Sequence, residues 1–160
     1  MSMIGNFLAL PQDELDCLFE EPETIASSLD EKYADAIVDI DKAWHGIHFV
    51  LVGEQYGGEP PLSNVVFGAK PIGEEDVGYG PALGTTAESV KQIAAALDEI
   101  SEEKFREKFD ASALEKADIY PQIWDEGDEA LDYLASYFAE LKDFYKSAAK
   151  SGNAVITFLN

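Results

Sequence analysis

The last third of the chain carries a long amphipathic segment that is followed directly by a β-prone one. From residue 128 to 150, apolar residues recur at the three- and four-residue spacing of one helix face. Lysines gather near the carboxyl end, where they complement the helix dipole. Gly152 stops the helix, and AVITFL (154–159) has the composition of a strand. Because a terminal strand normally adds to an existing sheet, this feature predicts a domain that combines a long helix with a β-sheet.

The rest of the chain supplies further helices and short strands. Cap residues and apolar spacing predict helices after Pro11, after Pro22, from Asp41 to Gly53, from Thr85 or Thr86 to Ile100, from Ser101, and from Asp110. β-branched and aromatic residues in LSNVVFG (62–68) predict a strand. The fold class is therefore a single helix-rich α/β (α+β) domain over residues 1–160. Its small mixed sheet is expected to contain NFLALP (6–11), LSNVVFG, AVITFL and a segment such as AIVDID (36–41) or PALG (81–84).

The charge balance limits the partners. The chain has 32 Asp and Glu against 11 Lys and Arg, which gives a formal net charge of −21. Such a surface repels phosphate backbones and anionic lipids, so we expect neither nucleic acid nor membranes as partners. A basic protein or peptide remains possible, and the alternative is that the carboxylates only keep the protein soluble.

Cysteine content and hydropathy indicate the compartment. Cys17 is the only cysteine, which excludes an intrachain disulfide and any cysteine-rich metal site. The amino-terminal residues lack the basic region of a signal peptide, and no apolar stretch approaches the ~18 residues of a spanning helix. We therefore expect a cytoplasmic protein.

The two histidines of the chain lie three residues apart on the helix predicted from Asp41 to Gly53. Helical spacing places His48 on one face with Trp44 and Leu51, and His45 on an adjacent face. An HxxH pair could share a metal only with ligands from elsewhere, and it lacks the glutamate of an HExxH site. Buried neutral imidazoles, each held by a hydrogen bond, are the alternative. His45 is the better candidate to reach a pocket.

Two further segments carry candidate site residues. The glycine-rich loop IGEEDVGYGPA (72–82) presents Glu75, Asp76 and Tyr79, and it fits either a ligand site or a solvated turn. It contains neither glycine pattern of a phosphate-binding loop. IYPQIWD (119–125) holds Tyr120 and Trp124, which could wall a pocket with Asp125 at its rim, or could pack the long helix on the sheet.

Several motifs together resemble a known family. MIGNFLAL, DIDKAWHGIHFVLVG, PLSNVVFG, EEDVGYGPA and IYPQIWD occur in the order and spacing of the YfbM-like family of uncharacterised bacterial proteins. The resemblance covers essentially the whole chain. It implies a helix-rich α/β domain of a cytoplasmic protein, and it supplies no activity, cofactor or catalytic residue. Leu83 departs from the family pattern, which commonly has arginine at this position.

These observations lead to two hypotheses about function. Because no catalytic signature accompanies the acidic composition, the first is a non-catalytic binding protein for a basic protein or peptide. The second is a hydrolase or metal-assisted enzyme in which His45 or His48, Asp76 and Tyr79 converge in a cleft near Trp124. No cofactor and no metal site are predicted.

Overall fold

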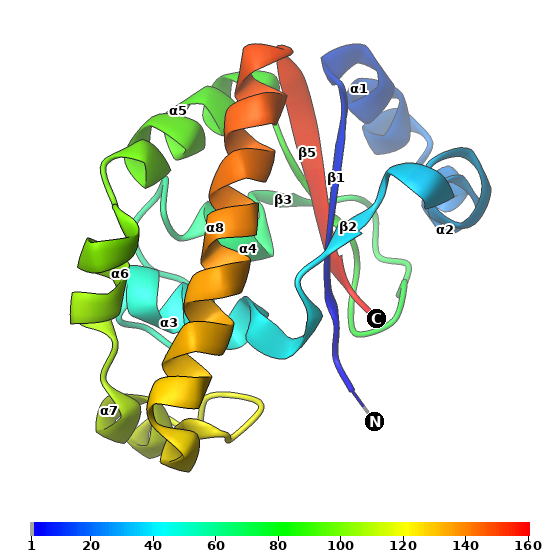
Figure 1. Ribbon diagram of the computed structural model, residues 1–160. Coiled ribbons are helices and arrows are strands. Elements are labelled where there is room, and N and C mark those ends of the chain that lie inside the picture. Colours follow the sequence, from blue (N-terminus) through cyan, green and yellow to red (C-terminus); the bar gives the residue numbers. More distant parts are fainter. Residues whose placement is uncertain (1) are drawn as a thin grey trace.

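A small sheet, covered by helices on both faces, forms the centre of the protein (Figure 1). The computed structural model describes residues 2–160. The strands are β1 (Gly5–Pro11), β2 (Val38–Asp39), β3 (Lys70–Pro71), β4 (Leu83–Thr85) and β5 (Asn153–Leu159), and their order in the sheet is β2-β1-β5-β4-β3. The predicted amino-terminal and closing strands are confirmed as the two long neighbours β1 and β5. AIVDID and PALG contribute the short strands β2 and β4.

The sheet is antiparallel throughout, so the prediction of a mixed sheet was wrong in that detail. Each neighbouring pair, β1–β2, β1–β5, β4–β5 and β3–β4, is antiparallel. Parallel neighbours require a crossover connection on one face of the sheet, whereas β3 and β4 are joined by the loop 72–82 alone. Strand propensity does not reveal whether two neighbouring strands run parallel or antiparallel, because the path of the connecting segments decides this.

Eight α-helices surround the sheet in the described residues. They are α1 (Gln12–Glu20), α2 (Ile25–Ser27), α3 (Trp44–Val52), α4 (Asn64–Phe67), α5 (Ala87–Asp98), α6 (Glu102–Lys108), α7 (Ala111–Lys116) and α8 (Asp128–Lys150). The side chains of Thr86, Ser101 and Asp110 accept hydrogen bonds from the backbone N–H three residues further on, which confirms them as the caps of α5, α6 and α7. The long helix α8 has the predicted bounds.

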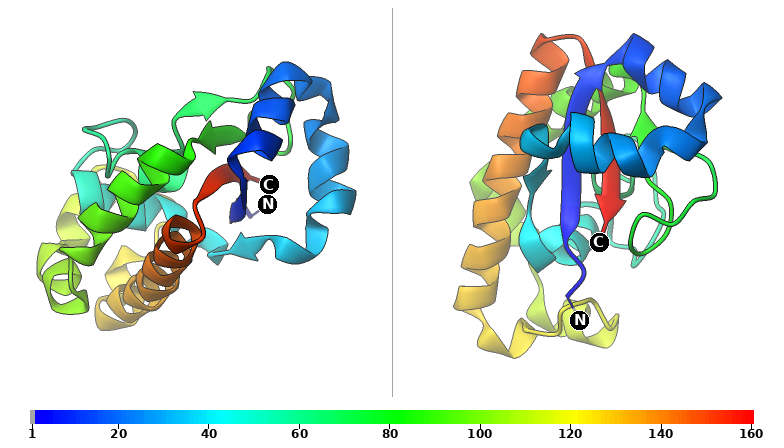
Figure 2. Two further views of the ribbon diagram at one scale, coloured as in Figure 1. Left: turned by 90° about the horizontal axis from the view of Figure 1, so that it is seen from above. Right: turned by 90° about the vertical axis from the view of Figure 1, so that its right-hand side faces the viewer.

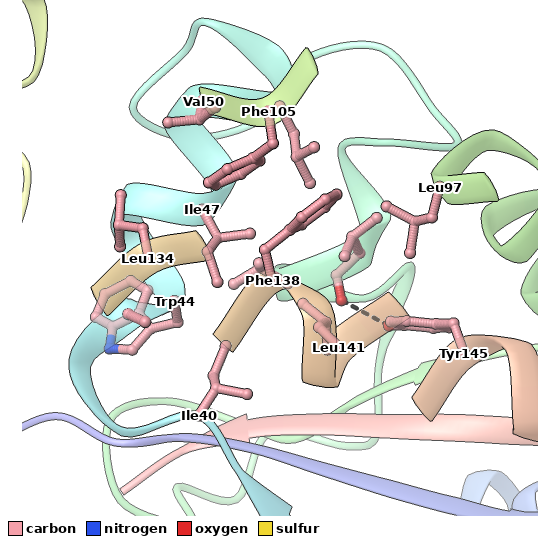
Figure 3. Close-up of a cluster of buried hydrophobic side chains, with 14 of the residues drawn as sticks. Ile40, Trp44, Ile47, Val50, Leu97, Phe105, Leu134, Phe138, Leu141 and Tyr145 are labelled. Atoms are coloured by element: carbon pink, nitrogen blue, oxygen red, sulfur yellow. Dashed lines mark hydrogen bonds between the residues drawn. The ribbon is translucent and has the colours of Figure 1, made fainter. Parts of the chain in front are cut away.

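The segment LSNVVFG forms the short helix α4 and not the predicted strand. Val65 and Val66 are both buried, and a short apolar run that is buried all round has no periodicity to separate strand from helix. Tertiary contacts decide the outcome. The Tyr145 hydroxyl of α8 donates to the carbonyl oxygen of Val65 at 2.6 Å, which satisfies one of the carbonyls that a helix end leaves open (Figure 3). Gly68 then ends α4 at a φ of 73°.

Alternate residues of the long strands point into two hydrophobic clusters, one on each face. Phe7 and Val155 belong to the larger cluster beneath α3, α5 and α8, whereas Leu8 and Ile156 belong to the smaller one beneath α1 and α2. The two views of Figure 2 show α8 and α5 on one side of the sheet and the α1–α2 arm on the other. The period-two pattern of β1 and β5 therefore builds a core with three layers.

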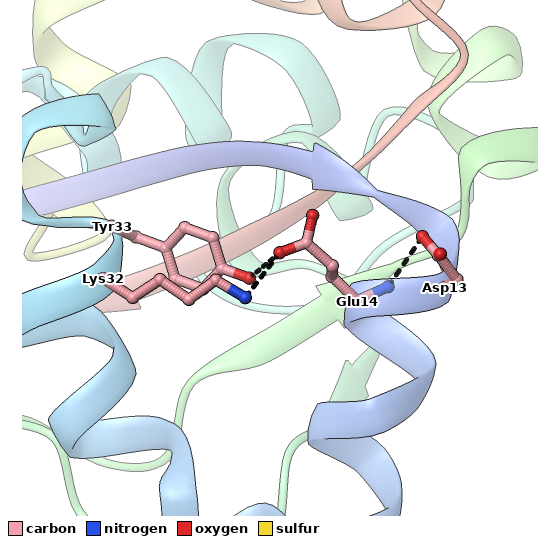
Figure 4. Close-up of polar contacts among 4 residues, drawn as sticks. All are labelled: Asp13, Glu14, Lys32 and Tyr33. Atoms are coloured by element: carbon pink, nitrogen blue, oxygen red, sulfur yellow. Dashed lines mark hydrogen bonds and ion pairs between the residues drawn. The ribbon is translucent and has the colours of Figure 1, made fainter.

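A polar contact at the surface joins α1 to the segment that follows α2. Glu14 Oε1 accepts hydrogen bonds from the Tyr33 hydroxyl at 2.5 Å and from Lys32 Nζ at 2.8 Å, while Asp13 accepts from the backbone N–H of Glu14 (Figure 4). The bonds to Lys32 and Tyr33 lower the pKa of Glu14. Because the Lys32 side chain is 63% exposed, solvent screens the ion pair, and the contact orients this segment more than it stabilises the fold.

Helix α3 packs against α8 at Gly46, where the side chains of Trp124 and Leu134 fill the space beside the glycine. A Cβ on Gly46 would lie 2.8 Å from the Trp124 ring and 2.9 Å from both δ carbons of Leu134. We expect Gly46→Val to lower the free energy of unfolding by about 1–3 kcal/mol, because the added methyl groups have no space. Chemical denaturation checks this result. In a Leu134→Ala background, Gly46→Val should cause a smaller loss in the free energy of unfolding. Equal losses in the two backgrounds would contradict the contact between Gly46 and Leu134.

No helix within residues 2–160 combines the length and the apolar composition needed to cross a bilayer.

Candidate functional site

A cavity of about 480 Å³ opens beside the sheet, at the ends of β4 and β5. This volume falls in the range of small-molecule and side-chain binding sites. Its wall comes from segments that are far apart in the sequence, and we call it the aromatic cavity. The lining residues are Met3, Trp44, His45, Gln55, Tyr56, Val66, Phe67, Tyr79, Pro81, Leu83, Asp118, Tyr120, Thr157, Phe158 and Leu159.

One wall of the aromatic cavity is a row of stacked rings. The Trp44 ring stacks with Tyr120, at a centroid distance of 5.7 Å, and with His45, at 4.9 Å. Tyr56 also stacks with His45, at a centroid distance of 5.2 Å. Hydrogen bonds from Trp44 Nε1 to the Met3 carbonyl and from the Met3 N–H to the Tyr120 hydroxyl tie this wall to the amino-terminal strand region. The wall is therefore fixed before any ligand arrives.

His45 is a structural member of this wall. Its Nδ1 accepts a hydrogen bond from the backbone N–H of Tyr120 at 3.0 Å, so the ring proton lies on Nε2, which donates to the Gln55 carbonyl at 3.1 Å. Burial lowers the pKa of His45, against smaller opposing effects of the Gln55 carbonyl and Asp118. With both ring nitrogens engaged, the neutral imidazole has no free atom for a metal or a proton transfer.

His48 lies outside the aromatic cavity, on the core side of α3. Its side chain is fully buried, and neither ring nitrogen has a hydrogen-bond partner among the described residues. The ring of Phe67 packs edge-on against it at 4.6 Å. Burial, with a smaller contribution from His45 and against an opposing effect of the nearby Gly57 backbone, lowers the pKa of His48 to about 4. His48 is therefore a neutral core residue, and the two histidines do not form a common ligand set.

The glycine-rich loop is an ordered turn built around Asp76. One carboxylate oxygen of Asp76 accepts the backbone N–H groups of Gly78, at 2.8 Å, and Gly80, at 3.0 Å. The Tyr79 N–H donates to the Leu159 carbonyl, which ties the loop to the end of β5. Asp76 thus shapes the loop, and the loop places the Tyr79 side chain in the lining of the cavity.

The rim of the cavity exposes two aromatic side chains. Tyr56 is 61% exposed and Tyr79 is 40% exposed, and the third large hydrophobic side chain with comparable exposure in residues 2–160 is Val38 on β2. An exposed aromatic ring at the mouth of a pocket is typical of binding surfaces. Tyr56, Phe67 and Asp118 were missed by the sequence interpretation. The tyrosine among glycines in GEQYGGEPP (53–61) was the one local signal that could have indicated a binding loop.

The predicted candidates separate into two groups. His45, Tyr79 and Tyr120 line the aromatic cavity together. His48, Glu75, Asp76, Trp124 and Asp125 are not part of its lining. Trp124 is buried under α3 and α8, where its Nε1 donates to the Ile119 carbonyl at 2.8 Å, while Glu75 and Asp125 are exposed. Of the cleft predicted from His45 or His48, Asp76 and Tyr79 near Trp124, the cavity lining contains His45 and Tyr79, and it does not contain His48, Asp76 or Trp124.

Within the described residues, no three histidine, cysteine or acidic side chains come together in a way that would hold a metal ion. Leu83 lies in the wall of the cavity and makes it more apolar.

The antiparallel sheet, its helical cover and the aromatic cavity define a helix-rich α/β domain with a preformed pocket beside the sheet. The chain belongs to the family DUF1877, which is described as a domain of unknown function and which it matches over residues 1–158. This match and the comparisons below confirm the resemblance to YfbM-like proteins.

Two comparisons give the relation to individual proteins. The chain is 25% identical over 173 aligned positions to protein YfbM of Escherichia coli strain K12, with 99% of each chain covered. The crystal structure of YfbM from Escherichia coli, titled a protein of unknown function, superposes with a TM-score of 0.78 at 22% identity, and covers 98% of this chain and 99% of that chain. This likeness confirms the predicted helix-rich α/β fold.

Proposed function

We propose that the protein is a non-catalytic binding protein, and that a basic protein or peptide docks over the aromatic cavity. The observation that carries the proposal is the rim of the cavity, where Tyr56 and Tyr79 are exposed above a wall of fixed rings. Tyrosine and tryptophan dominate the energetics of many interfaces, since they bury a large area with few torsions to fix.

The charge of the chain supports a basic occupant. With a formal net charge of −21, the surface attracts cationic partners over a distance and accelerates their association. Aromatic faces add to this attraction, because their π electrons favour a cation placed above the ring.

The positions of the titratable groups favour binding over catalysis. The enzyme alternative needs a histidine with a free nitrogen close to Asp76 and Tyr79. Both ring nitrogens of His45 are engaged, His48 is buried against Phe67 and is not part of the cavity lining, and one oxygen of Asp76 accepts hydrogen bonds within its own loop. The enzyme hypothesis therefore has no observation in its favour.

Binding of short labelled peptides tests the proposal. We expect peptides with a central arginine or lysine to bind at low salt, to weaken as salt screens the charges, and to outcompete glutamate peptides of the same length. Fluorescence anisotropy of a labelled basic peptide gives the dissociation constant. Tyr56→Ala and Tyr79→Ala should each weaken binding by about tenfold or more, because each removes a rim anchor.

Val38→Ala is the matched control, because Val38 is also 40% exposed but lies on β2 away from the lining of the cavity. Its dissociation constant should equal that of the unsubstituted protein. If no basic peptide binds at low salt, or if all three variants behave alike, the proposal is wrong.

A further inference from the structure

Asp118 is the one Asp, Glu, Lys or Arg side chain in the lining of the aromatic cavity, where His45 is neutral with both ring nitrogens engaged. It is exposed, and it makes no ion pair within residues 2–160, where the ion pairs are those of Lys32 and Arg106 with other carboxylates. The lining also contains no lysine or arginine that would compete for it. The cavity therefore presents one unneutralised negative charge beside aromatic rings.

The backbone around Asp118 is held in an unfavourable conformation that places this residue. Asp118 and Gln122 both have positive φ, of 58° and 72°, although neither is glycine. For Gln122 such a conformation costs about 1–3 kcal/mol and persists only where surrounding contacts enforce it, whereas aspartate adopts a positive φ more readily. Those contacts are present: the Tyr120 N–H donates to His45, and the Ile119 carbonyl accepts from the buried Trp124 ring.

The carboxylate of Asp118 is also oriented by a side chain. Gln122 Nε2 donates to Asp118 Oδ1, while Oδ2 accepts no hydrogen bond from the described part of the chain. A carboxylate has acceptor capacity on both oxygens, so Oδ2 is available to a donor on a ligand. Tyr120, two residues further along the same turn, contributes its ring to the wall of the cavity.

From this arrangement we infer that the group bound in the aromatic cavity is the guanidinium of an arginine side chain, with Asp118 as its counter-ion. A guanidinium is planar, so it stacks on tyrosine faces while its N–H groups donate to a carboxylate. An ammonium group is compact and strongly hydrated, and it gains less from flat rings. This inference rests on the proposed function, and it names the side chain that a basic peptide would insert.

Three small probes separate charge from shape: N-acetyl-argininamide, N-acetyl-lysinamide and the neutral N-acetyl-citrullinamide, which is nearly isosteric with the first. Two-dimensional NMR titrations give the dissociation constants and show which amides move. We expect argininamide to bind more tightly than lysinamide and citrullinamide, with shifts at Tyr56, Tyr79 and Tyr120. Equal binding of citrullinamide, or tighter binding of lysinamide, would overturn the assignment.

Asp118→Asn tests the counter-ion without disturbing the turn, because asparagine tolerates a positive φ as well as aspartate does. The variant should weaken argininamide binding by about tenfold and leave citrullinamide binding unchanged. Asp35→Asn, at an exposed position outside the cavity lining, makes the same change in net charge and should have no effect. An equal loss in both variants would mean that only the overall charge acts, and would overturn the role of Asp118.

The two proposals fail in different ways. If basic peptides bind through Tyr56 and Tyr79 but Asp118→Asn leaves their affinity unchanged, the inference about Asp118 is wrong and the proposed function stands. If argininamide binds and depends on Asp118 while no peptide binds, the guanidinium site stands and docking of a peptide is wrong.

Discussion

Replacement of Phe138 by alanine should lower the free energy of unfolding by about 3–5 kcal/mol. Phe138 lies on the inner face of α8 and is 1% exposed, and its ring stacks on that of Phe105 at a centroid distance of 4.2 Å (Figure 3). Truncation removes this contact and leaves a cavity between α6 and α8 that the surrounding helices fill only in part. Urea denaturation followed by circular dichroism measures the loss.

Ser136→Ala is the control for Phe138→Ala, because Ser136 is an exposed position of the same helix and alanine is the better helix former. It should not lower the stability. If Phe138→Ala proves too unstable to fold, Phe138→Leu should retain the fold with a smaller loss, since most of the apolar volume remains. A loss below about 1 kcal/mol for the alanine variant would show that Phe138 is not a core residue.

Stability should fall as the pH decreases from about 6.5 towards 4, in part because of His48. The pKa of this buried ring is lowered from 6.5 to about 4, so in this range the unfolded chain binds a proton that the folded chain excludes. The contribution of neutral His48 is present above pH 6.5 and is lost as the pH decreases towards the folded pKa. Its magnitude is up to about 3 kcal/mol.

His48→Phe separates this effect from the titration of the many carboxylates. Phenylalanine keeps a ring beside Phe67 and removes the two unpartnered nitrogens, so the variant should be at least as stable as the unsubstituted protein at about pH 7.5. The stability of the variant relative to the unsubstituted protein should be greater at about pH 5, where the histidine is being protonated in the unfolded state. Urea denaturation at both pH values gives the difference, and a difference that is independent of pH would contradict this account.

Part of the candidate site could be predicted from the sequence. The helical spacing of Trp44, His45 and His48 separated the two histidines, and the structure places His45 in the cavity wall and His48 in the core. The composition of 72–82 indicated an ordered loop, and Tyr79 is the residue that this loop brings to the cavity. The partners that fix these residues, namely the Gln55 carbonyl, the Tyr120 N–H and the Leu159 carbonyl, have no local signal.

Elements with strong local signals could be predicted from residue patterns alone. Cap residues and apolar spacing fixed α5, α6, α7 and α8, and the composition of the two terminal segments fixed β1 and β5. These signals act between residues a few positions apart, where hydrogen bonds and side-chain contacts form within one helix or strand.

Three features depend on contacts between distant segments: the antiparallel pairing of the strands, the helical state of LSNVVFG, and the cavity. The cavity wall combines Met3, the first turn of α3, Tyr56, Tyr79, the turn at Asp118 and the end of β5, which are separated by many residues in the chain. Burial and long-range hydrogen bonds decide which of these side chains are neutral, which are tied to the backbone and which remain exposed. Such effects depend on neighbours that the fold brings together, so no local pattern in the sequence contains them.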